Sequence, residues 1–423
     1  MSAPGPKTPF VAIACGGTGG HLFPGLAVAE QLRQRGCSVA VMISPKDVDQ
    51  QAVKSVGGQA SACPDVTLKR EPQPGAPMEI FTLPAIGLQH RNYLAFAGSC
   101  WKSFLAARRI FRQRKPDAVL AMGGFTSAPP AWVGKDLGAR AFLHESNTIP
   151  GRANRLLARF VDEAFVGFPE AAARLKARKI TPTGTPVRLG FAPDARRPLP
   201  DPACRAALGL DAECPTVLVV GGSQGAHGIN EMILSALPLL AGKPWQWLHL
   251  TGARDLERVK AAYAARGLRA VVKPFLAEME LALGAATAAV SRAGASSLAE
   301  LAAVRLPALL VPFPAAADNH QFYNARAFEA TGAARLFEQK GATPERVAAA
   351  VVELMENRDA LFQMRAALAQ WHNPKAAEQI AESILSAVFL SAGNLSAQSR
   401  PNPCPPAGRP RSRRPEQEHF SIA

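Results

Sequence analysis

The fold is decided by the stretch Phe10-Val-Ala-Ile-Ala-Cys-Gly-Gly-Thr-Gly-Gly-His21 and its continuation Leu22-Phe-Pro-Gly-Leu-Ala-Val-Ala-Glu30. An apolar run with β-branched residues is followed by four glycines. A helical pattern, which we expect to begin near Pro24, comes after them. This order predicts a strand, a glycine loop and a helix N-terminus. Glycines let backbone N–H groups approach a ligand, and the positive end of the helix dipole points to the same place. The stretch therefore predicts a site for a phosphate, a diphosphate or an anionic transition state, with tight strand–helix packing as the structural alternative.

The loop differs from the commoner phosphate-binding loops. A Walker A motif ends in Gly-Lys-Ser/Thr, whereas His21 follows Gly20, and the dinucleotide fingerprint requires glycine where Leu22 stands. NAD and ATP are therefore disfavoured. The feature also recurs, because strand-like runs lead into Gly221-Gly-Ser-Gln-Gly-Ala226 and into Gly123-Gly124. This recurrence argues against mere packing.

Length and composition indicate a globular protein of two domains and a tail. The chain has 423 residues, of which 48% are hydrophobic and 19% are charged. Its N-terminus lacks the apolar core of a signal peptide, and no apolar run approaches the roughly 20 residues of a membrane-spanning helix. The seven cysteines are irregularly spaced and contain no C-x-x-C motif. This usage predicts reduced thiols in the cytoplasm, without a zinc site or a disulfide framework.

The basic excess is concentrated in one segment. The net charge is +15, and Lys69 to Lys115 contains nine basic residues and two acidic ones. A basic surface can bind nucleic acid, anionic lipid or an acidic substrate. Because no zinc-finger, RNP or KH signature accompanies it, we do not expect nucleic acid as a partner.

Strand and helix patterns alternate along both halves of the chain, which predicts parallel sheets wound by helices on both faces. The expected strands are Phe10–Ala14, Ser38–Ser44, Ala118–Met122, Ala141–His144 and Glu163–Val166, then Thr216–Val220, Trp245–Leu250, Ala270–Val272, Ala288–Val290 and Ala308–Val311. In the first half we expect helices near 25–35, 47–56, 93–113, 127–138 and 151–159. The proline-rich segment Ala62 to Ile86 predicts a surface excursion. From Ser391 onward the Pro/Arg-rich composition predicts a disordered tail.

Seven motifs in fixed order resemble the MurG family of glycosyltransferases, and the similarity covers about residues 8 to 390. They are Gly-Gly-Thr-Gly-Gly-His at 16–21, Gly-Gly-Phe-Thr-Ser at 123–127, His-Glu-Ser-Asn at 144–147, Gly-Thr-Pro-Val-Arg at 184–188, Gly-Gly-Ser-Gln-Gly-Ala at 221–226, Arg-Ala-Gly-Ala at 292–295 with Glu300, and Asp-Asn-His-Gln-Phe-Tyr-Asn-Ala at 318–325.

The resemblance implies the α/β GT-B architecture, in which two Rossmann-like domains face a cleft. An N-terminal acceptor and membrane domain would span 8–188 and be completed by a C-terminal helix at about 372–390. A UDP-GlcNAc domain would span 189–371, and 391–423 would be the tail. The family transfers GlcNAc from UDP-GlcNAc to undecaprenyl-diphospho-MurNAc-pentapeptide, with inversion. This reaction belongs to peptidoglycan synthesis, and hence to cell shape and division.

The resemblance also implies partners and a location. The enzyme would need neither metal nor cofactor, because glycine loops and helix dipoles can neutralise the diphosphate. It would lie peripherally on the cytoplasmic face of the bacterial inner membrane, against an anionic surface, with other cell-wall synthesis proteins as further partners. A D-x-D string at Asp47-Val48-Asp49 could suggest a metal, but we expect it to cap a helix.

Two residues are candidates for catalysis. The pKa of histidine suits general-base work on a sugar hydroxyl, so His21 is the candidate base; the alternatives are helix capping and hydrogen bonding to a phosphate. Glu145 follows a predicted strand, where ligands bind in wound sheets. His144-Glu145 does not continue into H-E-x-x-H, so the sequence does not indicate a zinc site there.

By resemblance, the second half supplies most of the donor site. Glu300 would bind the ribose diol, Leu276 would lie beside uracil, and Gln321 would read the sugar hydroxyls. Ser223 and Gln224 would contact the diphosphate. The remaining substrate-binding residues would be Thr18, Gly19, Gly20, Asn147, Arg188, Ala295, Ser296, Ser297, Leu298 and Ala299. For Arg188 an inter-domain salt bridge is the alternative, and for Glu300 an ordinary helix glutamate.

The basic segment contains a candidate membrane patch, which resembles the family in character but not in exact residues. It combines large apolar side chains with cations, namely Leu94, Trp101, Phe104, Arg108 and Arg109. The alternative is a buried helix with a solvated basic end.

Two other functions compete with this reading. One is a different UDP-sugar enzyme, either a glycolipid glycosyltransferase or a UDP-GlcNAc 2-epimerase. The other is a non-catalytic scaffold that binds a membrane or nucleic acid.

Overall fold

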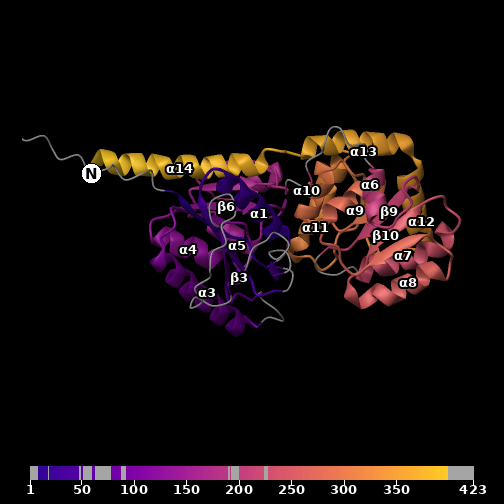
Figure 1. Cartoon of the computed structure of the whole chain (residues 1–423), viewed down its shortest axis with the longest axis horizontal. Coiled ribbons are helices and arrows are strands. Elements are labelled where there is room, and N and C mark those ends of the chain that lie inside the picture. Colours follow the sequence, from indigo (N-terminus) through magenta and orange to yellow (C-terminus); the bar gives the residue numbers. More distant parts are fainter. Residues whose placement is uncertain are drawn as a thin grey trace, which may run out of the picture. The chain divides into compact units, whose positions relative to one another are not determined.

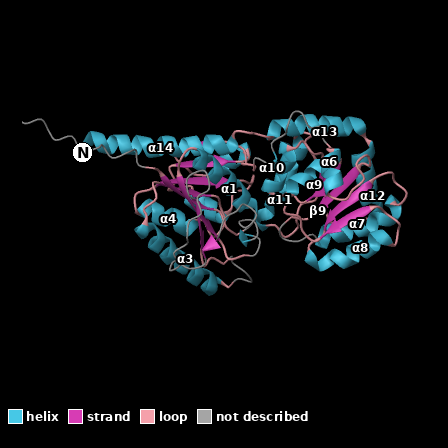
Figure 2. Ribbon diagram, viewed as in Figure 1, coloured by secondary structure: helices cyan, strands magenta, loops and turns pink. Residues whose placement is uncertain are grey.

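The structure is a computed structural model that describes residues 8–17, 19–46, 49–50, 78–86, 92–188, 191, 200–222 and 227–390, with the backbone alone at 60–61 and 391–398. Both of its sheets belong to one compact unit that ends at Val388. Strands lie inside and helices flank them in each half (Figure 2). We call the halves the first lobe, up to Arg188, and the second lobe, from Phe191 to Trp371.

The first lobe is built on eight parallel strands in the order β3-β4-β2-β1-β5-β6-β7-β8. They are β1 (Phe10–Ala14), β2 (Ser38–Ile43), β3 (Ala60–Ser61), β4 (Met78–Thr82), β5 (Ala118–Ala121), β6 (Arg140–Glu145), β7 (Glu163–Val166) and β8 (Ile180–Pro182). The helices are α1 (Gly19–Gln34), α3 (Tyr93–Gln113), α4 (Ala128–Asp136) and α5 (Arg152–Leu157), with a 3₁₀ turn at Pro169–Arg174.

The central strand β1 explains why helices cover both faces of this sheet. All five of its residues are buried. Val11 and Ile13 pack in the cluster that contains residues of α1 and α14 (Ala376–Gln398), whereas Ala12 packs on the other face with Ile110 of α3. Because alternate residues of a strand point to opposite faces, an uninterrupted apolar run predicts this double cover.

The second lobe repeats the plan with six parallel strands in the order β11-β10-β9-β12-β13-β14. They are β9 (Thr216–Val220), β10 (Gln246–Leu250), β11 (Ala270–Lys273), β12 (Ala288–Ser291), β13 (Ala308–Leu310) and β14 (Arg335–Leu336). The helices are α6 (Pro202–Ala207), α7 (His227–Leu240), α8 (Leu256–Ala264), α9 (Met279–Ala285), α10 (Ala295–Ala303), α11 (His320–Ala330), α12 (Pro344–Glu356) and α13 (Arg358–Trp371), with 3₁₀ turns at Ala253–Asp255 and Ala317–Asn319.

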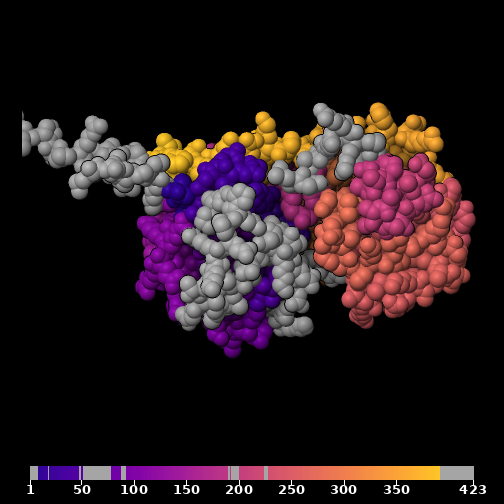
Figure 3. Space-filling model, in the orientation of Figure 1, coloured from indigo at the N-terminus to yellow at the C-terminus, as the bar shows by residue number. Residues whose placement is uncertain are grey.

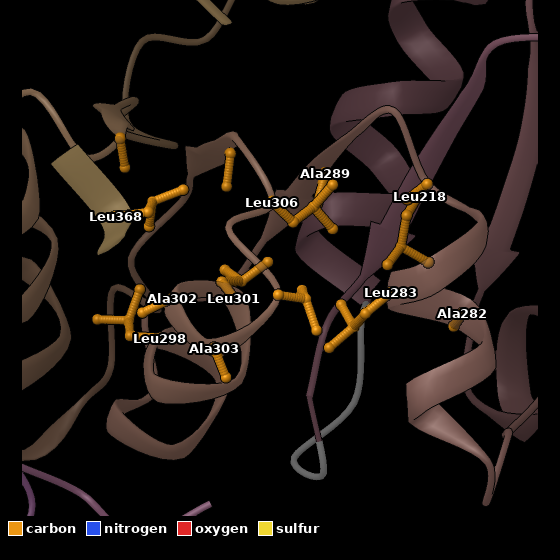
Figure 4. Packing of buried hydrophobic residues seen from close by; sticks show 14 of the residues in the cluster. Leu218, Ala282, Leu283, Ala289, Leu298, Leu301, Ala302, Ala303, Leu306 and Leu368 are labelled. Atoms are coloured by element: carbon orange, nitrogen blue, oxygen red, sulfur yellow. The ribbon is translucent and has the colours of Figure 1, made fainter. Parts of the chain in front are cut away.

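Each face of this second sheet has its own core. Val217 and Val219 of β9 pack with α7 and α12, and Leu218 between them packs with α9 and α10. Figure 4 shows the latter cluster, in which side chains from β9 and β12 meet Leu283 of α9 and the apolar residues of α10. The core therefore fixes the N-terminus of α10 beside the carboxyl end of β12.

Helix α14 returns to the first lobe, as expected. Ala377, Ile380 and Ile384 belong to the same core cluster as β1 and α1, and Arg35 forms an ion pair with Glu378 at 3.0 Å. Figures 1 and 3 show this helix, in yellow, beside the indigo N-terminal elements.

Three expectations need correction. The segment at 62–86 is not wholly a surface excursion, because β4 pairs with β2 inside the sheet. Helix α1 begins at Gly19 and not near Pro24, which lies within it. Residues 391–398, expected in the disordered tail, continue α14 as helix; the rest of the tail lies outside the described residues. Within the described residues, no helix combines the length and the apolar character that crossing a bilayer requires.

Candidate active site

His21 lies in the first turn of α1, and its ring occupies space that two glycines leave open. A Cβ atom at Gly123 would come within 2.9 Å of the imidazole Cε1, and one at Gly124 within 3.3 Å of Cδ2. Both glycines have positive φ, +106° and +77°, in the turn after β5. The third glycine pair that the sequence showed after a strand therefore makes room for the imidazole.

Burial and neighbouring charges act on His21 in opposite directions. Desolvation lowers the pKa of the imidazole below its usual value, and the negative charge of Glu145 partly offsets that effect. His320, the first residue of α11 in the second lobe, lowers the pKa further. A neutral imidazole near neutral pH is the form that can accept a proton.

Glu145, at the end of β6, organises the loop that follows. It is 1% exposed. Its Oε1 accepts hydrogen bonds from the backbone N–H and the Nδ2 of Asn147, at 2.8 and 3.1 Å. Its Oε2 accepts from the N–H of Gly151 at 2.9 Å and from Nδ2 of Asn154 at 2.8 Å. Both carboxylate oxygens are engaged, so Glu145 acts on His21 through its charge.

Asn324 of α11 joins this loop to the second lobe, and the sequence analysis assigned it no role. It is fully buried. Its Oδ1 accepts from the N–H and the hydroxyl of Thr148, at 3.0 and 2.9 Å. Its Nδ2 donates to Oδ1 of Asn147 at 3.0 Å and to the carbonyl of Ala293 at 3.2 Å. Its place at the end of the Asp318–Ala325 motif was the available signal, but its partners lie far away in sequence.

Arg188 and Glu300 lie close together where α1 contacts α10. The guanidinium of Arg188 lies 4.4 Å from the ring centre of Phe23, on α1, and 5.1 Å from that of Phe191. Burial raises the pKa of Glu300 to about 7, and the charge of Arg188 opposes that shift. Repulsion by Glu280 raises this pKa as well, and a hydrogen bond with Ser296 lowers it. Glu300, the predicted ribose-binding carboxylate of the second lobe, thus has the cation of Arg188, from the first lobe, nearby.

The other predicted donor residues lie on α10 and at the start of α11. Ala295 and Leu298 are buried in the core, while Ser296, Ser297 and Ala299 are partly exposed in the first turns of α10. Oε1 of Gln321 accepts from the N–H of Phe313 at 2.9 Å. Leu276 is 7% exposed and packs in the same core cluster as α10.

Two successive residues before α11 have strained backbones. Asp318 and Asn319 have φ of 50° and 53°, a region that non-glycine residues adopt rarely. Asp318 also pairs with Arg155 of the first lobe at 3.1 Å. Such strain concentrates at functional sites, and here it immediately precedes His320 and Gln321.

The two glycine loops are described in part. Gly19 and Gly20 are the first residues of α1, so their N–H groups belong to a helix N-terminus. Thr18, Ser223 and Gln224 lie outside the described residues. The roles predicted for these and the other site residues stay predictions.

Asp49 differs from the helix cap that the sequence predicted. Its carboxylate is fully buried and accepts hydrogen bonds from the N–H of Gly17 and from Ser44, on the floor of the first glycine loop. Asp47 and Val48 lie outside the described residues.

The candidate membrane patch lies on α3. Leu94 is 89% exposed and Trp101 is 62% exposed, so the alternative of a buried helix is wrong for these two residues. Trp101 and Phe104 stack with their ring centres 5.6 Å apart, and Phe104 packs against the core. A pocket of about 520 Å³ follows along the helix, lined by Leu105, Arg108, Arg109, Arg112 and Gln113.

Comparisons with known proteins agree on one family. The glycosyltransferase family 28 N-terminal domain matches residues 11–166, and the C-terminal domain of the same family matches residues 216–380. The chain is 36% identical over 396 residues to a UDP-N-acetylglucosamine--N-acetylmuramyl-(pentapeptide) pyrophosphoryl-undecaprenol N-acetylglucosamine transferase of Anaeromyxobacter sp. (strain Fw109-5), covering 92% of this chain and 96% of that protein.

Solved structures share the architecture. The crystal structure of Acinetobacter baumannii MurG has a TM-score of 0.66 and 27% identity, over 90% of this chain and all (100%) of that one. A UDP-N-acetylglucosamine 2-epimerase has a TM-score of 0.62 at 14% identity, over 92% of this chain and 97% of that one, which shows a shared fold alone. The two parallel α/β lobes therefore form a GT-B architecture, and the chain belongs to the MurG family of glycosyltransferases.

Proposed function

We propose that the protein transfers N-acetylglucosamine from UDP-GlcNAc to the muramyl hydroxyl of undecaprenyl-diphospho-MurNAc-pentapeptide, converting lipid I to lipid II without a metal or a cofactor. The observation that carries this proposal is the hydrogen bonding of Asn324, in the Asp318–Ala325 motif of the second lobe, to Thr148 and Asn147 in the loop that Glu145 organises in the first lobe. His320 of the same motif also lowers the pKa of His21. The candidate base His21 and the segment proposed to read the sugar, Asp318–Gln321, then belong to one site.

In the proposed reaction, His21 takes the proton of the acceptor hydroxyl. The hydroxyl oxygen forms its bond to the anomeric carbon while the bond from that carbon to UDP breaks, and UDP leaves with the electron pair. Attack from the opposite side inverts the anomeric configuration. Glu145, whose charge raises the pKa of His21, stabilises the imidazolium that forms.

The donor would lie mainly on the second lobe. Glu300 accepts the ribose hydroxyls, Leu276 lies beside uracil, and Gln321 reads the sugar. The diphosphate meets Ser223, Gln224 and the N-terminus of α10, where the helix dipole favours negative charge. Ala295, Ser296, Ser297, Leu298 and Ala299 line the nucleotide on that helix. Thr18, Gly19, Gly20, Asn147 and Arg188 complete the transfer site.

The acceptor is a lipid, so we place the protein peripherally at the cytoplasmic face of the inner membrane. The apolar and basic side chains of the α3 patch support contact with an anionic surface. In this role the enzyme would act in peptidoglycan synthesis, and hence in cell shape and division, beside other cell-wall synthesis proteins.

The test is transfer of labelled GlcNAc from UDP-GlcNAc to a lipid-diphosphate muramyl-peptide, with chelator present, for wild type, His21→Ala and Glu300→Ala. Wild type should form product. Loss of His21 should lower kcat about a hundredfold or more while UDP-GlcNAc binding stays near that of wild type. Loss of Glu300 should mainly weaken donor binding.

Other outcomes would point elsewhere. Equal losses of turnover and donor binding in His21→Ala would make His21 a binding residue. UDP-GlcNAc binding without transfer, together with formation of the C2 epimer of the sugar nucleotide, would replace transfer with epimerisation.

A further inference from the structure

The floor of the first glycine loop is a buried carboxylate. Oδ2 of Asp49 accepts hydrogen bonds from the N–H of Gly17 at 2.7 Å, from the N–H of Ser44 at 3.2 Å and from the Ser44 hydroxyl at 2.5 Å. Asp49 is 0% exposed, and its Oδ1 has no hydrogen-bond partner within the described residues. One oxygen of this side chain thus gathers three donors from the ends of two neighbouring strands.

Gly17 is held on both sides. Its carbonyl accepts a hydrogen bond from Nζ of Lys46 at 2.8 Å, while Asp49 holds its N–H. Its φ of +109° suits only glycine, and a Cβ atom there would lie 3.0 Å from the ring of Phe125. Lys46 is itself fixed over that ring, 5.5 Å from its centre. The peptide groups on both sides of Gly17 are therefore tied to side chains that follow β2.

The position of Asp49 is electrostatically unfavourable unless it serves a purpose. Burying a carboxylate costs free energy, and its negative charge beneath an anion-binding loop works against the anion. A helix cap does not require burial, because a capping side chain works at the surface. What the buried position provides is a fixed orientation for the first peptide groups of the loop that precedes His21.

We propose that Asp49 is a positioning residue for glycosyl transfer, which fixes the Gly17 peptide so that the first glycine loop and His21 keep the geometry required in the transition state. This inference rests on the proposed function. It predicts an effect on kcat and little effect on the donor, which binds mainly to the second lobe.

Asp49 also acts on His21 through its charge. It raises the pKa of the imidazole, as Glu145 does more strongly from β6. The other titratable groups that face His21 are His320 of α11 and His144 of β6. Neutralising Asp49 should therefore lower the pKa of His21 and move the acid limb of the kcat profile to lower pH.

The test compares Asp49→Asn with Asp117→Asn in the full chain. Asp117 is a matched control because its Oδ2 accepts from the N–H of Phe10 at 2.9 Å, at the opposite end of β1 from the loop. In each variant the replaced carboxylate accepts a hydrogen bond from a backbone N–H at one end of β1. The measurements are thermal unfolding, kcat, KM for UDP-GlcNAc and the pH profile of kcat.

Asp49→Asn should lower kcat about ten- to hundredfold, leave KM for UDP-GlcNAc within about twofold, and shift the acid limb downward. The amide is uncharged, so its oxygen in the place of Oδ2 accepts these three hydrogen bonds less strongly, and its NH2 group in the place of Oδ1 is buried without an acceptor among the described residues. Asp117→Asn should reduce thermal stability and leave kcat and the acid limb at wild-type values.

If Asp49→Asn does not fold, Ser44→Ala is the second variant, because it removes one donor and leaves the carboxylate in place. It should lower kcat about threefold or more at unchanged KM. The inference is overturned if the folded Asp49 or Ser44 variant turns over like Asp117→Asn, or if only KM for the donor changes. Absence of transfer by wild type would instead overturn the proposed function.

Discussion

Glu145 is buried and Glu300 is only partly exposed, but their surroundings balance the negative charge differently. Glu145 accepts four hydrogen bonds, two on each oxygen. Glu300 has Arg188 and Ser296 nearby, and burial still raises its pKa to about 7. A group with that pKa changes charge in the physiological range, so its ligand must compete with a proton.

Donor binding should therefore depend on pH through Glu300. Only the carboxylate can accept hydrogen bonds from both ribose hydroxyls, so affinity is greatest above the pKa of about 7. Below that value the dissociation constant of UDP should rise, approaching tenfold per pH unit. Calorimetry from pH 5.5 to pH 8.5 measures this dependence, with uridine as a second ligand because it keeps the ribose and lacks the phosphates.

Glu300→Gln provides the control for this titration. Its affinity should be lower and flat across the range, since the amide does not titrate. If Glu300→Gln keeps the pH dependence of the wild-type dissociation constant, or if the wild type shows no such dependence, Glu300 does not bind the ribose.

At the same scale, the sequence named candidate site residues but did not predict what surrounds them. The sequence showed Gly123-Gly124 as a further glycine pair after a strand, but not that these glycines make room for the imidazole of His21. The partners of Asn324 lie more than 30 positions away, at Ala293, Asn147 and Thr148. Local patterns contain no information about such pairs, because only the folded chain brings them together.

Among the elements, strands with continuous apolar runs were predictable, whereas strand β4, which lacks such a run, was not. The bounds of β1, β7 and β9 agree with the prediction, and all residues of β1 and β7 are buried. Strand β4, Met-Glu-Ile-Phe-Thr, has Ile80 as its one fully buried residue. It therefore has no apolar run to reveal it. Helix α3 was predicted to the residue, but its exposed apolar side chains became known only from the structure.

Helix α3 should determine membrane affinity. The double change Leu94→Ser and Trp101→Ser removes the two most exposed large apolar side chains of the patch. Because each such side chain contributes on the order of 1.5–3 kcal/mol when it leaves water, binding to anionic vesicles should weaken at least tenfold. Transfer to a short-chain, water-soluble acceptor should remain near wild type. Vesicle co-sedimentation at low salt measures the affinity.

The control is Trp132→Ser, on α4. Trp132 is 55% exposed, close to the 62% of Trp101, but it lies on α4 and packs edge-on against Phe160. Its loss should not change vesicle binding. Equal weakening in both variants would mean that general surface hydrophobicity, and not the α3 patch, determines the affinity.

At the scale of the whole molecule, the chain passes between the lobes twice, and the candidate site contains residues from both lobes. It crosses once near Arg188 and again where α14 returns to the core beside β1. The sequence predicted two wound lobes and the return of the last helix, because apolar periodicity and the family motifs carry that information. It could not predict the contacts between lobes, which are polar or aromatic and come from distant segments. Phe168 meets Phe328 and Trp371 in this way.

Asn324 should couple the lobes during transfer. Asn324→Ala leaves Thr148 and the amide of Asn147 without their buried partner, at a cost of about 1–3 kcal/mol in the free energy of unfolding. The loop that carries Glu145 and Asn147 then loses its link to α11. We expect kcat to fall at least tenfold, while the dissociation constant of UDP stays within about threefold because α10, the helix proposed to bind the donor, is unchanged.

The comparison for this change is Arg155→Ala, which removes an inter-lobe ion pair with Asp318 at 3.1 Å. Arg155 is 45% exposed, so solvent screens the pair and its loss should cost less than about 1 kcal/mol. Kinetics of GlcNAc transfer and equilibrium unfolding should be measured for both variants. If Arg155→Ala lowers kcat as much as Asn324→Ala, any weakening between the lobes is enough. If only Asn324→Ala lowers it, the buried amide acts by holding the Glu145 loop against the segment that is proposed to read the sugar.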